Sequence, residues 1–118
     1  MNTEKELFED LASIYDSWLS LAKESTSDSE ANLNWADEPK AFLKLRETLK
    51  ESNSQVHFEQ VISEIIQGVL HSTLVVFDGG TKLADKTNLK IEDDNGHILP
   101  KNLHEEFVSY LMETGRLK

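Results

Sequence analysis

The feature that most constrains the fold is a long apolar stripe at helical spacing in the middle of the chain. After Ser54, a residue that can cap a helix, apolar side chains recur every three or four residues, the period of one helix face. Asp78-Gly79-Gly80 then supplies a typical helix end. A strand over residues 73–78 is the alternative, because β-branched residues gather there. The period predicts one central helix over residues 54–77, in which these side chains are nearly fully buried: Ile62, Ile65, Ile66, Val69 and Phe77.

The same stripe is too interrupted to predict a membrane span. Its most apolar part, residues 61–77, contains Glu64, Gln67 and His71 and is shorter than the run of about 20 apolar residues that crosses a bilayer. The first residues lack the basic start and apolar run of a signal peptide, and a chain without cysteine suits a reducing compartment. We therefore expect a core helix, no membrane association and a cytoplasmic location.

Two helices are predicted before the stripe. Residues 3–23 place apolar side chains on one face behind Asn2 or Thr3 as a cap. Residues 38–51 begin with a proline in the first turn and predict a second helix. The polar segment 24–37 between them predicts a loop, whose Trp35 either packs back onto the core or forms an exposed contact with a partner.

Shorter elements are predicted after the stripe. Residues 89–91 and 97–99 flank the turn sequence Asn95-Gly96 and predict a small hairpin. Asn102 then caps a last helix, with Glu105 at the capping-box position, and Gly115 ends it. The prediction is a mainly α fold: an irregular four-helix bundle with one small β-hairpin before the last helix, forming a single domain over residues 1–118.

The net charge of the chain indicates which classes of partner it can bind. The net charge is −10, and residues 1–38 hold ten acids against Lys5 and Lys23. A negative field of this kind opposes binding to nucleic acid or anionic membranes and speeds encounter with a basic protein. Solubility alone is the competing explanation. If the acids serve recognition, we expect the partner to contact the exposed acids of the first helix: Glu6, Glu9, Asp10 and Asp16.

Catalytic and metal-binding motifs are not found in the sequence. The four histidines form no pair at zinc-protease spacing, cysteine ligands do not exist, and no phosphate-binding glycine loop or nucleophile elbow occurs. We expect neither a cofactor nor a metal. One polar stripe on the central helix stays open to two interpretations, either solvated or lining a pocket in which His71, Asp78 and His104 bind a ligand; its members are Glu64, Gln67, His71 and Asp78.

The C-terminal part of the chain resembles a known class of proteins. The run from His71 to Gly80, followed by residues 103–107 and 114–116, is similar to a pattern in small acidic bacterial proteins of unassigned function, some of which are thought to be toxin-immunity proteins. The resemblance covers about the C-terminal 50 residues. It implies a bacterial, cytoplasmic protein and assigns no role to any residue.

Two functions are therefore carried forward. The first is a non-catalytic protein-interaction domain, of the immunity or antitoxin type, that binds a basic protein. The alternative is a small-molecule-binding or enzymatic site built around His71, Asp78 and His104. The sequence identifies neither the partner nor the oligomeric state.

Overall fold

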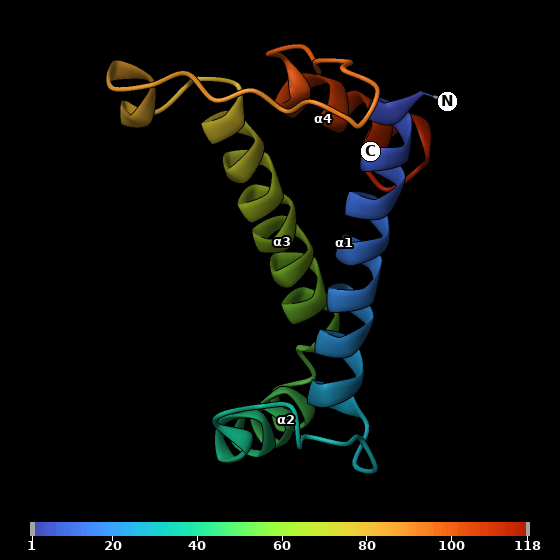
Figure 1. The fold of residues 1–118 in the computed structure, drawn as a ribbon. Helices are drawn as coiled ribbons and strands as arrows, with labels where there is room; N and C mark the ends of the chain where they lie inside the picture. The colour runs from blue at the N-terminus through green and yellow to red at the C-terminus, as the bar shows by residue number, and fades with distance from the viewer. Residues whose placement is uncertain (1, 118) are drawn as a thin grey trace. The chain divides into compact units, whose positions relative to one another are not determined.

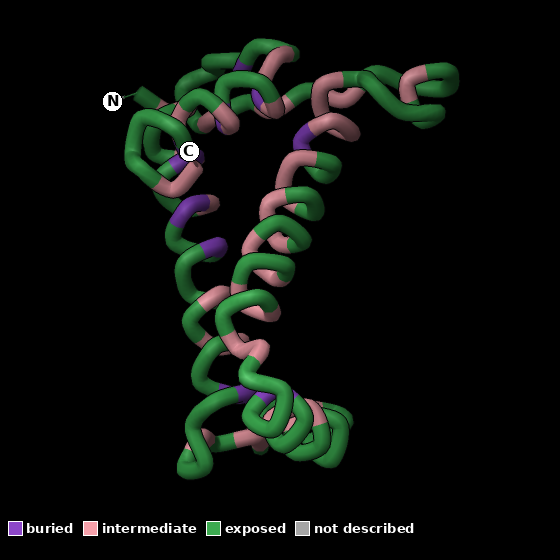
Figure 2. The backbone as a smooth tube through the Cα atoms, turned by 180° about the vertical axis from the view of Figure 1, so that it is seen from behind, coloured by how far each residue is buried: buried purple, intermediate pink, exposed green. Residues whose placement is uncertain are grey.

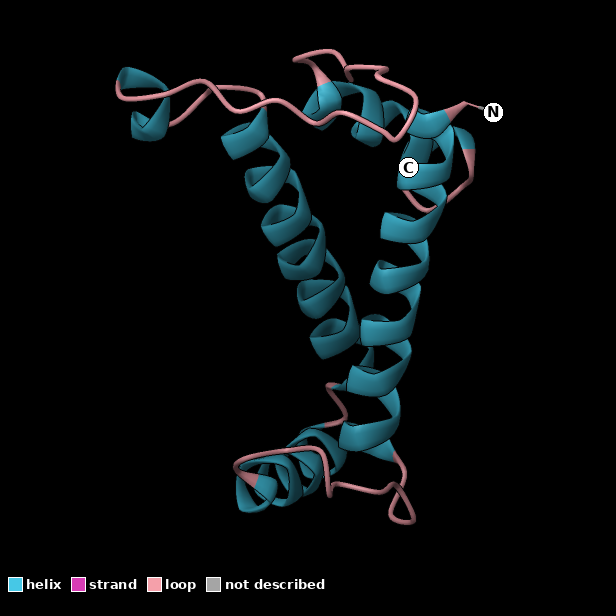
Figure 3. Ribbon diagram, viewed as in Figure 1, coloured by secondary structure: helices cyan, strands magenta, loops and turns pink. Residues whose placement is uncertain are grey.

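The computed structural model describes residues 2–117 and contains four α-helices (Figures 1 and 3). They are α1 (Thr3–Ser27), α2 (Pro39–Ser52), α3 (Gln55–Phe77) and α4 (Leu103–Glu113), and a short 3₁₀ helix, η1 (Lys82–Asp85), lies between the last two. The prediction of a mainly α fold with four helices is confirmed.

The helix ends show how local chemistry sets the element bounds. The Asn2 side chain caps α1 by accepting a hydrogen bond from the Lys5 amide at 3.1 Å. α1 runs four residues past its predicted end, and hydroxyls of its last turn bond back to helix carbonyls, as Thr26 does to Ala22 at 2.8 Å. α3 ends at Phe77, and Gly79 follows with φ of 83°. The alternative of a strand over residues 73–78 is therefore wrong.

The predicted β-hairpin does not form strands. Within residues 2–117 the only sheet-like pairing is one antiparallel bridge between Glu92 and Ile98. The Asp93 carboxylate accepts hydrogen bonds from the Asn95 and His97 amides at 2.9 and 3.0 Å. This side chain satisfies the turn amides locally. The turn is where the sequence places it, and the pairing beside it goes no further than this bridge in the described residues.

Residue contacts divide the chain into two compact units. Unit 1 consists of the described parts of Met1–Ser13 and Gln67–Lys118, and unit 2 is Ile14–Ile66. Each unit contains a stretch of α1 and a stretch of α3. This division does not test the prediction of a single domain, which therefore stays a prediction.

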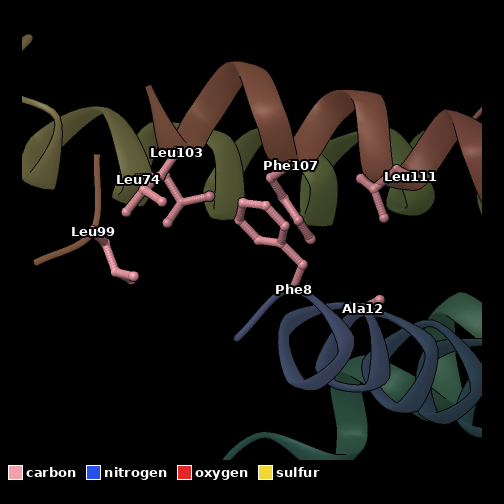
Figure 4. Close-up of a cluster of buried hydrophobic side chains, with 7 residues drawn as sticks. All are labelled: Phe8, Ala12, Leu74, Leu99, Leu103, Phe107 and Leu111. Carbon is pink, nitrogen blue, oxygen red and sulfur yellow. The ribbon is translucent and has the colours of Figure 1, made fainter. Parts of the chain in front are cut away.

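Unit 1 holds the apolar core, which Figure 4 shows in detail. α4 contributes Leu103, Phe107 and Leu111, spaced four residues apart on one face. The Phe107 ring lies against the Phe8 ring of α1, with centroids 5.6 Å apart. The remaining buried members of this cluster are Ala12, Leu74 and Leu99.

Polar contacts join α1 and α3 within unit 2. The buried Tyr15 hydroxyl bonds the Ser63 hydroxyl at 2.5 Å, and Gln55 donates to the buried Thr26 hydroxyl at 3.1 Å. Lys23 lies 3.8 Å from the Glu59 carboxylate. Several large apolar side chains of this unit are exposed, namely Ile14, Trp18, Trp35, Leu43, Val56, Val61 and Ile65.

The predicted burial of α3 is wrong. Ile65 is 54% exposed and Val69 is 61% exposed, while Ile62, Ile66 and Phe77 are half-buried. Figure 2 shows exposed and half-buried residues along α3, in which Leu74 alone is buried. The physical reason is that α3 is apolar on most of its circumference, and the segments packed against it in each unit cover only part of it.

Length and composition alone also allow α3 to cross a membrane. The stretch Gln55–Asp85 is long and apolar enough by those two criteria. The core helix of a water-soluble protein meets the same criteria, so this observation by itself assigns no location.

Candidate functional site

The alternative ligand site proposed from sequence is assembled in unit 1. Asp78 directly follows α3, and its carboxylate lies 2.5 Å from Nδ1 of His104 in the first turn of α4. The His71 ring, from α3, meets the His104 ring edge-on with centroids 5.2 Å apart. His104 therefore contacts both of the other residues that were predicted to share a site with it.

The Asp78 side chain has a structural role. Its buried side chain accepts hydrogen bonds from the Leu103 and His104 amides at 3.0 and 2.8 Å, so it caps α4 from a distant position in sequence. Asn102 occupies the N-cap position without a side-chain cap bond, and the capping box predicted with Glu105 is not used. Burial opposes ionisation of Asp78, but the hydrogen bonds from His104 and Leu103 outweigh it and lower the pKa of the carboxyl group.

The polar stripe on α3 is neither wholly solvated nor wholly enclosed. Glu64, in unit 2, is exposed, whereas Gln67 and His71, in unit 1, are half-buried. Among residues 2–117, no group of three or more histidine, cysteine or acidic side chains is placed to hold a metal ion. The contacts of Asp78 with Leu103 and His104 thus hold the start of α4 in place, and ligand binding by this cluster stays a prediction.

The predicted partner-binding acids are exposed. In unit 1, Glu6, Glu9 and Asp10 lie on the side of α1 away from the buried Phe8 and Ala12. In unit 2, Asp16 is also exposed.

Sequence reasoning missed an acid-lined depression in unit 1. It has a volume of about 290 Å³ and lies between α1 and α4. The acids of α4 that reach it, Glu106 and Glu113, are spaced seven residues apart, or two turns, with Ser109 between them. That spacing is visible in the sequence, whereas the apolar pattern of the last helix predicts only its buried face. The lining residues are Asn2, Glu4, Lys5, Phe8, Glu106, Ser109, Tyr110 and Glu113.

A second surface, in unit 2, is an apolar groove of about 480 Å³. Trp35 in the α1–α2 loop meets the Trp18 ring edge-on at 6.0 Å and the Phe42 ring at 5.2 Å. Both tryptophans stay about half exposed. Trp35 thus packs on aromatic neighbours while remaining partly exposed, and the alternative of contact with a partner stays a prediction. The groove is lined by Trp18, Ala22, Thr26, Trp35, Phe42, Leu45, Phe58, Ile62 and Ile66.

In comparisons with known proteins, no protein-family model, no curated protein and no solved structure matches the chain.

Proposed function

We propose that this protein is a non-catalytic interaction domain that binds a basic protein partner, as an immunity or antitoxin protein does. The observation that carries the proposal is the acid-lined depression of unit 1. Three of its side chains, Glu4, Glu106 and Glu113, are carboxylates, against the single Lys5. Phe8 and Tyr110, with ring centroids 6.0 Å apart, add aromatic surface.

This combination suits one lysine or arginine side chain of a partner. The aliphatic stem of such a side chain packs on aromatic surface while its charged head pairs with carboxylates. A guanidinium also forms charge-assisted hydrogen bonds with carboxylates that are shorter and stronger than neutral ones. The depression therefore supports insertion of a basic anchor residue from the partner.

The surrounding charge supports the same partner class. Glu6, Glu9 and Asp10 are exposed on α1 in the same unit, and the whole chain carries −10. Charges at the rim of an interface act chiefly on the association rate, and steering of this kind speeds encounter by about 10- to 1,000-fold at low salt. The expected partner is thus basic over the face that meets α1 and α4.

The proposal is tested first by co-purification and then by kinetics. The full chain is immobilised and exposed to basic proteins encoded beside its gene, and the association rate of any bound protein is measured at several salt concentrations. We expect the rate to fall as salt rises. Glu113→Lys should lower the rate at low salt by about tenfold or more, because it reverses one charge inside the depression.

Glu51→Lys is the matched control. Glu51 is exposed in unit 2 and does not line the depression, so its replacement makes the same change in net charge elsewhere. The proposal predicts a clearly smaller effect for this variant. Equal effects of the two variants, an association rate indifferent to salt, or the failure of every basic candidate to bind would contradict it.

A further inference from the structure

The apolar groove of unit 2 has no role in the function proposed above. Its volume of about 480 Å³ lies within the range of about 300 to 1,000 Å³ that small-molecule sites occupy. All nine of its lining residues are uncharged, and the one hydroxyl among them, on Thr26, already bonds the Ala22 carbonyl and the Gln55 side-chain amide. The groove therefore suits the apolar part of a small molecule, and a charged part of that molecule would have to be bound beside the groove.

A guanidinium group that no acid of the described chain neutralises lies beside the groove. Nη2 of Arg46 donates to the Ser25 carbonyl at 3.1 Å, and this contact joins α2 to the last turn of α1. The neighbours of these two residues in sequence, Leu45 and Thr26, both line the groove. Within residues 2–117, Arg46 forms no ion pair, although the chain holds 22 acids.

The polar atoms at this contact are incompletely paired. A guanidinium has five N–H donors, and the bond to the Ser25 carbonyl uses one of them. Nε of Arg46 and the Ser25 hydroxyl are buried and have no hydrogen-bond partner within the described residues, while Arg46 as a whole is half-buried. Because unpaired buried polar groups cost free energy, a hydrogen-bond acceptor that joined this contact would be bound favourably.

The charge of α2 favours an anion as that acceptor. The charged residues of α2 are Lys40, Lys44, Arg46 and Lys50 against Glu47 and Glu51. Among the four α-helices of residues 2–117, α2 alone carries a net positive charge, which attracts an anion to it. α2 also contributes Phe42 and Leu45 to the groove, so apolar lining and positive charge come from the same helix.

We propose that the groove binds a long-chain carboxylate, such as a free fatty acid, with its hydrocarbon tail among the lining residues and its head group paired with Arg46. Burial of the tail supplies affinity. The planar fork of one guanidinium matches a carboxylate, and the charge-assisted hydrogen bonds between them select the head group. The proposal concerns unit 2 and therefore fails independently of the basic partner proposed for unit 1.

A fluorescence titration of the full chain tests the proposal, because Trp18 and Trp35 both line the groove and are the only tryptophans. The probe is dodecanoate, used below the concentration at which it forms micelles. Dodecanol is the comparison ligand, since it has the same tail without the charge. We expect dodecanoate to change the tryptophan emission and to saturate at one molecule per chain.

Arg46→Gln separates binding of the head group from binding of the tail. It should raise the dissociation constant for dodecanoate by about tenfold or more, because it removes the charged partner of the carboxylate. The dissociation constant for dodecanol should stay within about twofold, which also shows that the groove has kept its fold. Lys44→Gln is the matched control: it removes the same charge from an exposed position on another side of α2 and should leave dodecanoate binding within about twofold.

The same measurements can overturn the proposal. A wild-type chain whose tryptophan emission does not respond to dodecanoate would do so, whatever the variants show. Equal loss of dodecanoate binding in the Arg46 and Lys44 variants would also do so, as would an equal loss of dodecanol and dodecanoate binding in Arg46→Gln. Ligand-free protein that dimerises or sediments with neutral phosphatidylcholine vesicles, with its tryptophans protected from acrylamide, would identify a second copy or a lipid surface as the occupant instead.

Discussion

Leu103→Ala is the change that most directly measures the core of unit 1. Leu103 is 2% exposed among the other core side chains. Truncation removes three carbon groups, which costs about 2.5 kcal/mol of transfer free energy, and the remaining cavity raises the loss in the free energy of unfolding to about 3 to 4 kcal/mol. The helix cap is kept, because the Leu103 backbone amide still donates to Asp78.

The assay is urea unfolding followed by far-ultraviolet circular dichroism, with Leu43→Ala as the matched control. Leu43, on α2, is 51% exposed, so the same truncation there should cost less than about 1 kcal/mol. Tryptophan fluorescence provides a second probe, because Trp18 and Trp35 both lie in unit 2. If residues 1–118 form one domain, Leu103→Ala should shift both probes equally. A loss below about 1 kcal/mol for Leu103→Ala would refute the core described for unit 1.

Two further variants test local features of the same unit. Asp78→Asn should cost about 1 to 2 kcal/mol in the free energy of unfolding, because it weakens the cap of α4. The folded state lowers the pKa of Asp78. The contribution of its carboxylate to the free energy of unfolding is therefore present above about pH 4 and is lost as the pH falls through the folded-state pKa. Urea unfolding at stepped pH should show that the difference in stability between wild type and Asp78→Asn shrinks in acid. An unchanged difference would contradict the cap. Gly80→Ala should cost about 1 to 2 kcal/mol, because a Cβ there would lie 2.6 Å from a methyl group of Val75. Adding Val75→Ala should recover part of that loss, and strictly additive effects would contradict the steric explanation.

Helix positions were predictable because they depend on neighbours in sequence. The apolar period placed α3 over residues 55–77, within a residue of its predicted bounds, and the glycines after Asp78 correctly marked its end. Pro39 similarly marked the first turn of α2. The end of α1 was missed, since hydroxyl groups that usually favour loops here bond back into the last turn through Thr26 and Ser27.

Burial and tertiary capping were less predictable because they depend on residues far apart in sequence. The period shows that Ile65 belongs to an apolar face but not whether anything covers that face. The cap of α4 comes from Asp78, which lies 25 residues before Leu103, while the local sequence offered Asn102 and Glu105. Sequence did propose His71, Asp78 and His104 as a possible group, because His71 and Asp78 belong to a polar stripe beside the Gly79-Gly80 turn. Their capping arrangement was not visible in any motif.

The claim that the apolar face of unit 2 is open to solvent in the single chain is tested most directly by acrylamide quenching of tryptophan fluorescence. Trp18 and Trp35 are the only two tryptophans, and both line the groove. The structure predicts that the dilute native protein is quenched at a substantial fraction of the rate seen in urea, because both tryptophans are about half exposed. Tryptophans shielded from acrylamide in the dilute, folded protein would show that the groove is a closed core and would contradict the account.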